Sequence, residues 1–283
     1  MIHLIGIDVD GTLLDSAGRF PNANRDAIHD AVNAGVHVAL VTGRSYPFAR
    51  PVAQGLPDSL TLIVSNGAVE RGMDGSTRAR RLLDKNVART VLDANAAHRA
   101  AAALVFDRDV HGQIVFETMD WTHPGRKGYW ARNKELIARS VPLEDALTED
   151  PIQVMFNGGF MAMRDLADAI RAQAHDATVS LTEYVDRDFS LVDITSPTAT
   201  KGHALASCAA ALGLAREQVM AIGDNFNDLE MLEFAGTPVV MGNAVEPLKA
   251  RGFHETAGQD EAGVAQAITR FVLKSRTSRS RPS

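Results

Sequence analysis

The sequence predicts an α/β fold: a doubly wound, Rossmann-like parallel sheet that carries an inserted α+β domain. Short apolar runs and amphipathic helical segments alternate over residues 1–64, and the same order returns after residue 200. Between these parts, helices and short strands follow each other in a different order. We therefore predict a discontinuous core domain, residues 1–83 and 192–283, and a cap domain inserted at residues 84–191.

The composition is that of a globular protein. The chain has 283 residues, of which 45% are hydrophobic and 23% charged, enough for two domains. Its net charge of −6 gives no reason to expect nucleic acid or an anionic membrane as partner, so a phosphate-bearing ligand would need a local cation. Cys208 is the only cysteine, and neither a leader peptide nor a membrane-length apolar run is evident. We expect a cytoplasmic protein, monomeric or homodimeric.

The elements of the first core segment follow from apolar patterning and turn residues. A helix at Asn24–Ala34 has an apolar face, and Gly35 is suited to end it. Asn66-Gly67 and Asp74-Gly75 are hairpin signals, so we expect the chain to leave the parallel sheet through a meander that ends near Leu83. The other predicted elements are strands at Ile2–Ile7, Val36–Val41 and Leu60–Val64 and a short helix at Tyr46–Gln54.

The cap segment predicts a separate α+β unit. Both tryptophans, Trp121 and Trp130, lie in it, together with Tyr129. Several of its polar residues, such as His111, Tyr184 and Arg187, are predicted to fall in turns, where solvation is the favoured explanation. His123, which precedes Pro124, indicates no role. The predicted helices are Asn86–His98, Lys127–Arg139 and Arg164–His175, and the predicted strands are Ala103–Phe106, Ile114–Glu117, Ile152–Phe156 and Val179–Thr182.

The second core segment is predicted to begin with a strand at Ser190–Ile194. The elements expected after it are a helix at Lys201–Leu212, a strand at Val219–Ile222, a helix that ends at Phe234 and a last strand at Pro238–Met241. The tail after Lys274 is basic and low in complexity, and we expect it to be a disordered, solvated end.

Chemistry-bearing residues follow the predicted parallel strands. Asp8 and Asp10 come after the first strand, Thr42 after the second and Asp224 after the strand at 219–222, and Lys201 opens a helix. The carboxyl ends of parallel strands meet at one edge of an open sheet, where ligands bind. We therefore expect these side chains to gather at one site.

The charges of that site require a cation. Asp8, Asp224 and Asp228 would contribute three negative charges against one positive charge from Lys201, and a phosphomonoester adds nearly two more. At a separation of about 4 Å and an effective dielectric constant near 20, each charge pair is worth about 4 kcal/mol. Without a divalent metal the site would repel a phosphate, so we expect Mg²⁺ to be obligatory.

The motifs resemble those of the haloacid dehalogenase superfamily, in particular its Cof-like (type IIB) branch of Mg²⁺-dependent phosphatases with an inserted cap. The resemblance covers nearly the whole chain short of the basic tail. The connector Thr198-Ala199-Thr200 departs from it, because it lacks the glycine that often precedes the motif lysine. The matching stretches are Asp8-Val9-Asp10-Gly11-Thr12, Thr42-Gly43-Arg44, Lys201-Gly202, Gly223-Asp224-x-x-Asn227-Asp228, Ser65-Asn66-Gly67-Ala68 and Met241-Gly242-Asn243-Ala244.

The resemblance implies the catalytic roles. Asp8 would attack phosphorus and become a transient aspartyl-phosphate. Asp10 would protonate the leaving alcohol and then take a proton from the hydrolytic water, a role that favours phosphate substrates over haloacids. Thr42 would donate its hydroxyl to the phosphoryl group, and Lys201 would neutralise charge on Asp8 and the phosphate.

The resemblance also implies the binding groups. The Mg²⁺ ligands would be the side chains of Asp8 and Asp224 and the backbone carbonyl of Asp10. Asp228 would either bind the metal directly or orient Lys201 or a metal-bound water. The groups expected to bind phosphate or substrate are Gly43, Arg44 and Asn227.

The function predicted on this basis is hydrolysis of small phosphorylated metabolites, with sugar phosphates as one candidate class. Two alternatives stay open at this point: a phosphomutase of the same branch and a non-catalytic phosphate-binding module. A cysteine phosphatase is excluded, because the residue six positions after Cys208 is Leu214 where an arginine would be needed.

Overall fold

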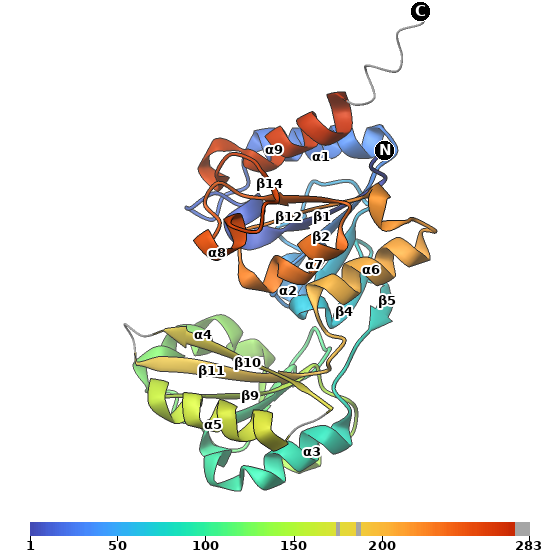
Figure 1. The fold of residues 1–283 in the computed structure, drawn as a ribbon. Coiled ribbons are helices and arrows are strands. Elements are labelled where there is room, and N and C mark those ends of the chain that lie inside the picture. The colour runs from blue at the N-terminus through green and yellow to red at the C-terminus, as the bar shows by residue number, and fades with distance from the viewer. Residues whose placement is uncertain (174–175, 185–187, 275–283) are drawn as a thin grey trace, which may run out of the picture. The chain divides into compact units, whose positions relative to one another are not determined.

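The computed structural model of the chain describes residues 1–173, 176–184 and 188–274 (Figure 1). It divides into two compact units, which are described separately: a larger one formed by Met1–Arg80 and Thr198–Ser283, and a smaller one formed by Arg81–Pro197. The division lies within a few residues of the predicted first boundary, between residues 83 and 84, and farther from the second, between residues 191 and 192. His175, Arg187 and the tail beyond Lys274 lie outside the described residues.

The larger unit is built on an eight-stranded sheet with the order β14-β13-β12-β1-β2-β3-β4-β5. The six strands from β14 to β3 are parallel, and β4 and β5 continue the sheet as antiparallel hairpins, so the predicted parallel sheet and meander are confirmed. The strands are β1 (Leu4–Asp8), β2 (His37–Val41), β3 (Thr61–Val64), β4 (Val69–Gly72), β5 (Thr77–Arg80), β12 (Val219–Gly223), β13 (Thr237–Val240) and β14 (His254–Glu255).

Helices cover both faces of this sheet, as a doubly wound fold requires (Figure 1). α1 (Asn22–Asn33) packs against α9 (Gly263–Ile268), and α6 (Lys201–Ala211) packs against α7 (Leu229–Phe234) in a cluster that also buries Cys208. The remaining helices are α2 (Tyr46–Ala49) and α8 (Glu246–Lys249). α2 is shorter than predicted, because Pro51 has no N–H with which to extend the helix.

The smaller unit has its own six-stranded sheet with the order β10-β11-β9-β6-β7-β8. Its strands are β6 (Ala102–Val105), β7 (Ile114–Phe116), β8 (Ile137–Arg139), β9 (Gln153–Gly158), β10 (Thr178–Tyr184) and β11 (Phe189–Thr195). Its helices are α3 (Lys85–Ala94), α4 (Pro124–Asn133) and α5 (Phe160–Gln173).

Two predictions for this unit are wrong. The strand predicted at Ser190–Ile194 to re-enter the core is part of β11, which pairs with β9 and β10 in the smaller sheet. The helix predicted at Lys127–Arg139 ends at Asn133, whose side chain donates to the Tyr129 carbonyl, and residues 137–139 form β8 instead. A short apolar run alone does not show which sheet a strand joins or whether a segment is a helix or a strand. In both places the pairing with distant strands determines the structure.

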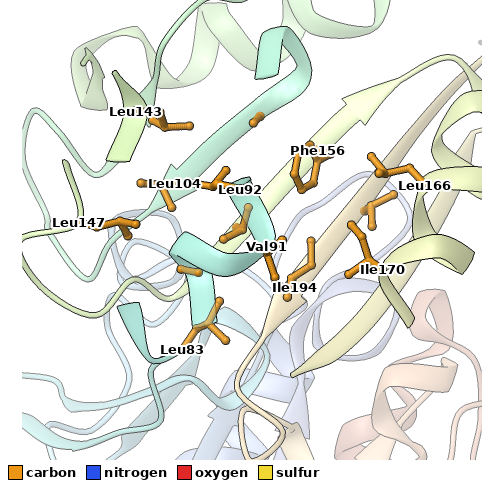
Figure 2. Packing of buried hydrophobic residues seen from close by; sticks show 14 of the residues in the cluster. Leu83, Val91, Leu92, Leu104, Leu143, Leu147, Phe156, Leu166, Ile170 and Ile194 are labelled. Carbon is orange, nitrogen blue, oxygen red and sulfur yellow. The ribbon is translucent and has the colours of Figure 1, made fainter. Parts of the chain in front are cut away.

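The core of the smaller unit lies on one face of its sheet. Leu104, Phe156 and Ile194 point from β6, β9 and β11 toward α3 and α5, as Figure 2 shows. Because side chains alternate along a strand, the residues between them, such as Ala103, Met155 and Leu191, lie on the opposite face. That face is covered by α4 and the segment before it, through Tyr129 and Trp121. Among the described residues, no helix is long and apolar enough to span a membrane.

Candidate active site

The site lies where the chain order of the larger sheet reverses. β1 is flanked by β2 on one side and β12 on the other, so the chain builds the sheet outward from β1 in both directions. β1 ends at Asp8, β2 ends just before Thr42, and β12 ends just before Asp224. This is the topological switch point, where open α/β sheets bind ligands at the carboxyl ends of their strands.

A buried lysine joins two of the aspartates. The Nζ of Lys201 donates to Oδ1 of Asp8 at 2.6 Å and to Oδ1 of Asp228 at 2.7 Å. The three side chains are between 0% and 6% exposed. Asp224 belongs to the same group: one carboxylate oxygen from each of Asp8, Asp224 and Asp228 lies within 4.8 Å of the others.

The electrostatics of this group favour an additional cation. Burial, and then the negative charge of Asp228, raise the pKa of Asp8 well above its usual value, against the opposing effect of Lys201. Burial also raises the pKa of Asp224. Burial alone would lower the pKa of Lys201, but the carboxylates of Asp8 and Asp228 raise it, so this lysine stays charged. One ammonium group cannot balance three carboxylates, and oxygen ligands suit a hard divalent ion such as Mg²⁺.

Backbone contacts hold the loop after β12 in place. Oδ2 of Asp228 accepts from the backbone N–H of Asp224 at 2.9 Å and of Asn225 at 3.1 Å. Both oxygens of Asp228 are therefore engaged, Oδ1 by Lys201 and Oδ2 by the loop. Thr12, which the sequence analysis did not single out as a site residue, donates its hydroxyl to Oδ1 of Asp224 at 2.8 Å.

Asp10 lies apart from the buried group and is paired with Arg44. The guanidinium donates from Nε to Oδ2 at 2.8 Å and from Nη2 to Oδ1 at 2.5 Å. The Asp10 side chain is 58% exposed, and that of Arg44 is 32% exposed. The structure therefore brings Asp8, Lys201 and Asp228 together and places Asp10 in a second, exposed ion pair.

The loop after β2 is held by Asn66, a residue of a predicted hairpin signal and of one matching stretch, whose backbone N–H donates to the Thr42 carbonyl at 3.0 Å. Asn66 adopts a left-handed conformation with φ of 53°, and its Oδ1 accepts from Nδ2 of Asn227 at 3.2 Å. A Cβ at Gly43 would lie 3.0 Å from the same Oδ1, so a larger residue there would crowd it. Thr42 is buried, and its hydroxyl accepts from the backbone N–H of Arg44 at 3.1 Å.

Two further loops complete the rim. Nδ2 of Asn243 donates to the carbonyl of Gly11 at 2.8 Å, a contact that only the resemblance of residues 241–244 pointed toward. The connector 198–200, which lacks the expected glycine, fits beside Gly67, because Gly67 leaves room for the Thr200 carbonyl. The hydroxyl of Thr200 also caps α6 by accepting from the backbone N–H of His203. A Cβ at Gly67 would lie 2.2 Å from that oxygen.

Gly11 offers a direct test of this geometry. Its φ is +87°, and a Cβ there would lie 2.4 Å from Oδ2 of Asp224. Gly18 has a similar φ of +73° with nothing within 4 Å, which makes Gly18→Ala a matched control. We expect Gly18→Ala to lose about 1 kcal/mol in free energy of unfolding because of the left-handed backbone, and Gly11→Ala to lose more because its Cβ would also overlap Asp224. Only Gly11→Ala should also weaken the binding of a divalent metal ion beside Asp224, and equal metal affinity of the two variants would contradict this geometry.

Comparisons with known proteins identify the family and the fold. The family model for haloacid dehalogenase-like hydrolases matches residues 5–268. The chain is similar to a 5-amino-6-(5-phospho-D-ribitylamino)uracil phosphatase of Bacillus subtilis, at 28% identity over 273 residues and 96% of each chain. It is 30% identical to a pyridoxal phosphate phosphatase of Escherichia coli, over 96% of this chain and 99% of the relative. A haloacid dehalogenase-like hydrolase from Bacteroides thetaiotaomicron shares the fold, with a TM-score of 0.78, 24% identity and coverage of 95% and 99%.

Proposed function

Because the chain belongs to the haloacid dehalogenase-like hydrolase family and is a phosphatase of that family, we propose that it hydrolyses small phosphomonoesters. The proposed reaction requires Mg²⁺ and passes through an aspartyl-phosphate on Asp8. The observation that carries the proposal is the buried group of Asp8, Lys201 and Asp228 beside Asp224. Buried carboxylates that outnumber their cations are costly unless a metal binds them. We also place the reaction in the cytoplasm, where the buried thiol of Cys208 would stay reduced.

The proposed first step forms a bond between a carboxylate oxygen of Asp8 and phosphorus. The P–O bond to the leaving group breaks, and Asp10 gives its proton to the departing alkoxide. Lys201 holds Asp8 by Oδ1, which orients the other oxygen, Oδ2, for attack. In the second step a water oxygen attacks phosphorus, Asp10 takes a proton from that water, and the bond from Asp8 to phosphorus breaks to release phosphate.

The proposed metal ligands are Asp8, Asp224 and the backbone carbonyl of Asp10. Bound Mg²⁺ would supply positive charge against the carboxylates and the phosphoryl oxygens. We assign Asp228 the orienting role rather than direct coordination, since both its oxygens already accept hydrogen bonds. Thr42, Gly43 and Asn227 are proposed to contact the phosphoryl group.

Arg44 is proposed to exchange partners during the reaction. Its ion pair with Asp10 engages both carboxylate oxygens, whereas the acid role requires Asp10 to face the leaving group. A phosphate dianion can accept the same guanidinium fork. We propose that Arg44 turns from Asp10 to the substrate, which frees Asp10 to act as the acid.

The substrates are proposed to be small phosphorylated metabolites. The relatives named above act on a ribitylaminouracil phosphate and on pyridoxal phosphate, both of which carry a nitrogen heterocycle. Sugar phosphates are a second candidate class.

A panel of phosphorylated metabolites, assayed for free phosphate with Mg²⁺ and with EDTA, tests the activity. An isomerised phosphate ester without free phosphate would instead identify a mutase, and no reaction across the panel would favour a binding module.

Asp224→Asn tests the metal assignment. The amide is a weaker ligand than a carboxylate, so we expect the Mg²⁺ concentration at half-maximal activity to rise by at least about tenfold. Activity should return in part at high Mg²⁺, because Asp8 remains. The measurement is phosphate release as a function of Mg²⁺ concentration, and an unchanged midpoint would remove Asp224 from the ligand set.

A further inference from the structure

A strained turn follows β3 in the larger unit, and the proposed chemistry does not use it. Ser65, Asn66 and Gly67 have φ of 50°, 53° and 98°, so three successive residues are left-handed. Glycine adopts this conformation freely and asparagine tolerates it, but for serine it costs free energy. The next hairpin of the same sheet, between β4 and β5, has only one left-handed residue, Gly75. Because such strain persists only where contacts hold it, and is concentrated at functional sites, the contacts of this turn indicate its role.

The turn contacts three loops of the candidate site. Two of its backbone N–H groups donate to the loop after β2, at the carbonyls of Thr42 and Arg44. The side chain of Asn66 accepts from Asn227 in the loop after β12, and Gly67 lies against the segment that precedes α6. The turn is therefore a common support for three loops that are far apart in the chain.

The backbone of the turn sets the direction of the Gly43 N–H. The N–H of Asn66 donates to the Thr42 carbonyl at 3.0 Å. The peptide bond between Thr42 and Gly43 is trans, so the N–H of Gly43 points opposite to that carbonyl and away from the turn. Among the residues that the structure describes, this N–H has no hydrogen-bond acceptor. It is therefore available to a ligand at the carboxyl end of β2.

Two side-chain donors lie near this N–H. The Thr42 hydroxyl oxygen accepts from the backbone N–H of Arg44 at 3.1 Å, which leaves its own O–H to donate. Nδ2 of Asn227 carries two N–H donors, and one of them donates to Oδ1 of Asn66 at 3.2 Å. The Asn66 carboxamide is packed against Gly43, since a Cβ at that glycine would lie 3.0 Å from Oδ1 and 3.4 Å from Nδ2. Asn66 therefore holds the second N–H of Asn227 near Gly43.

From these observations we propose that Asn66 is a positioning residue for phosphate binding. Its backbone orients the Gly43 N–H and its carboxamide holds Asn227, so that both present donors to one phosphoryl group. A charged acceptor gains more from such donors than a neutral one does. The inference rests on the proposed function, in which Thr42, Gly43 and Asn227 contact the phosphoryl group, and deepens it by adding a residue that acts through them.

Asn66→Gly tests the side chain alone. Glycine keeps the left-handed backbone and its N–H but removes the carboxamide that holds Asn227. With Mg²⁺ present, we expect inorganic phosphate to bind this variant about fivefold more weakly in titration calorimetry, the effect of one loosened hydrogen bond. The thermal midpoint in EDTA should not fall, because glycine relieves the strain, and Mg²⁺ affinity should not change. Ala262→Gly is the matched control, since Ala262 is also left-handed, with φ of 54°, and lies outside the proposed site.

A double-substitution cycle shows whether Asn66 acts through Asn227. Asn227→Ala should weaken phosphate binding about tenfold, because a hydrogen bond to a charged group is lost. Adding Asn66→Gly to that variant should cause no further loss, since the carboxamide has nothing left to hold. A loss of about fiftyfold in the double variant would mean that the two residues act independently, and it would overturn the proposal.

Failure of the proposed function gives a different result. If the unaltered chain neither hydrolyses a phosphomonoester nor binds phosphate with Mg²⁺, the proposed function fails, and the inference that rests on it fails too. If the unaltered chain binds phosphate and Asn66→Gly binds it equally well, only the inference fails. Equal losses in Asn66→Gly and Ala262→Gly would also overturn it, because the effect would then belong to glycine in general.

Discussion

Replacing Asp8 with asparagine is expected to lower phosphate release by at least about ten-thousandfold while the protein stays folded. Asparagine keeps the shape of the side chain but cannot attack phosphorus to form an acyl-phosphate. Asp26→Asn, at an exposed carboxylate of α1, is the matched control and should retain full activity.

The fold of Asp8→Asn should survive because of the other partner of Lys201. The ammonium group would still bond Asp228 at 2.7 Å, so no buried charge loses its only counter-ion. The substitution also removes a carboxylate whose pKa is raised by burial and by Asp228. We therefore expect a thermal midpoint no lower than that of the unaltered protein in EDTA, and a smaller upward shift on adding Mg²⁺.

Two results would contradict this account. Turnover within tenfold of the unaltered protein would mean that another group attacks phosphorus. Loss of the folded state would mean that Asp8 is required for the structure, and the activity measurement would then say nothing about a nucleophile. Thermal unfolding in EDTA, run beside the assay, separates these two cases.

The main sheet and its edge could be predicted from the sequence because the signals are local. The parallel strands β1, β2, β3, β12 and β13 are short, mostly apolar runs, and Asp8, Thr42 and Asp224 lie at the ends of three of them. The carboxyl ends of parallel strands meet at one edge of the sheet, so these positions are expected there whatever the directions of their side chains. The partners within that edge were not predictable in this way. The resemblance implied that Lys201 acts on Asp8 and that Asp228 can orient Lys201, but nothing in the sequence indicated that Arg44 holds Asp10. That pair depends on the directions of two side chains far apart in the chain.

The smaller unit was harder to predict for the same reason. The run at 190–194 would suit a strand in either sheet, and only its antiparallel pairing with β9 and β10 decides between them. β14 and α9 were not predicted, since β14 has two residues and α9 six, too few for a periodic signal. Trp121 and Tyr129 were noticed as aromatic residues of the insert, but the sheet face that they cover is formed by the alternating side chains of five strands at once.

Replacing Lys201 with methionine is expected to destabilise the protein in EDTA at neutral pH by about 3–5 kcal/mol and to abolish activity. Methionine fills a similar volume, so the loss comes from charge: the carboxylates of Asp8 and Asp228 would stay buried without the ammonium that bonds them both. Lys249→Met is the matched control, because the partner of Lys249 is Glu246, which is 88% exposed, and such pairs contribute at most about 1 kcal/mol.

The pH dependence of Lys201→Met distinguishes charge from packing. The folded-state pKa of Asp8 is already raised by burial and by Asp228, and losing Lys201 raises it further. A carboxyl group with a raised folded-state pKa binds its proton more tightly in the folded than in the unfolded state. The lost stability should therefore return as the pH falls through that raised value toward the unfolded pKa of about 4. Urea unfolding in EDTA at neutral pH and near pH 5 measures this recovery, and a deficit that stays constant with pH would attribute the loss to packing and deny the lysine its electrostatic role.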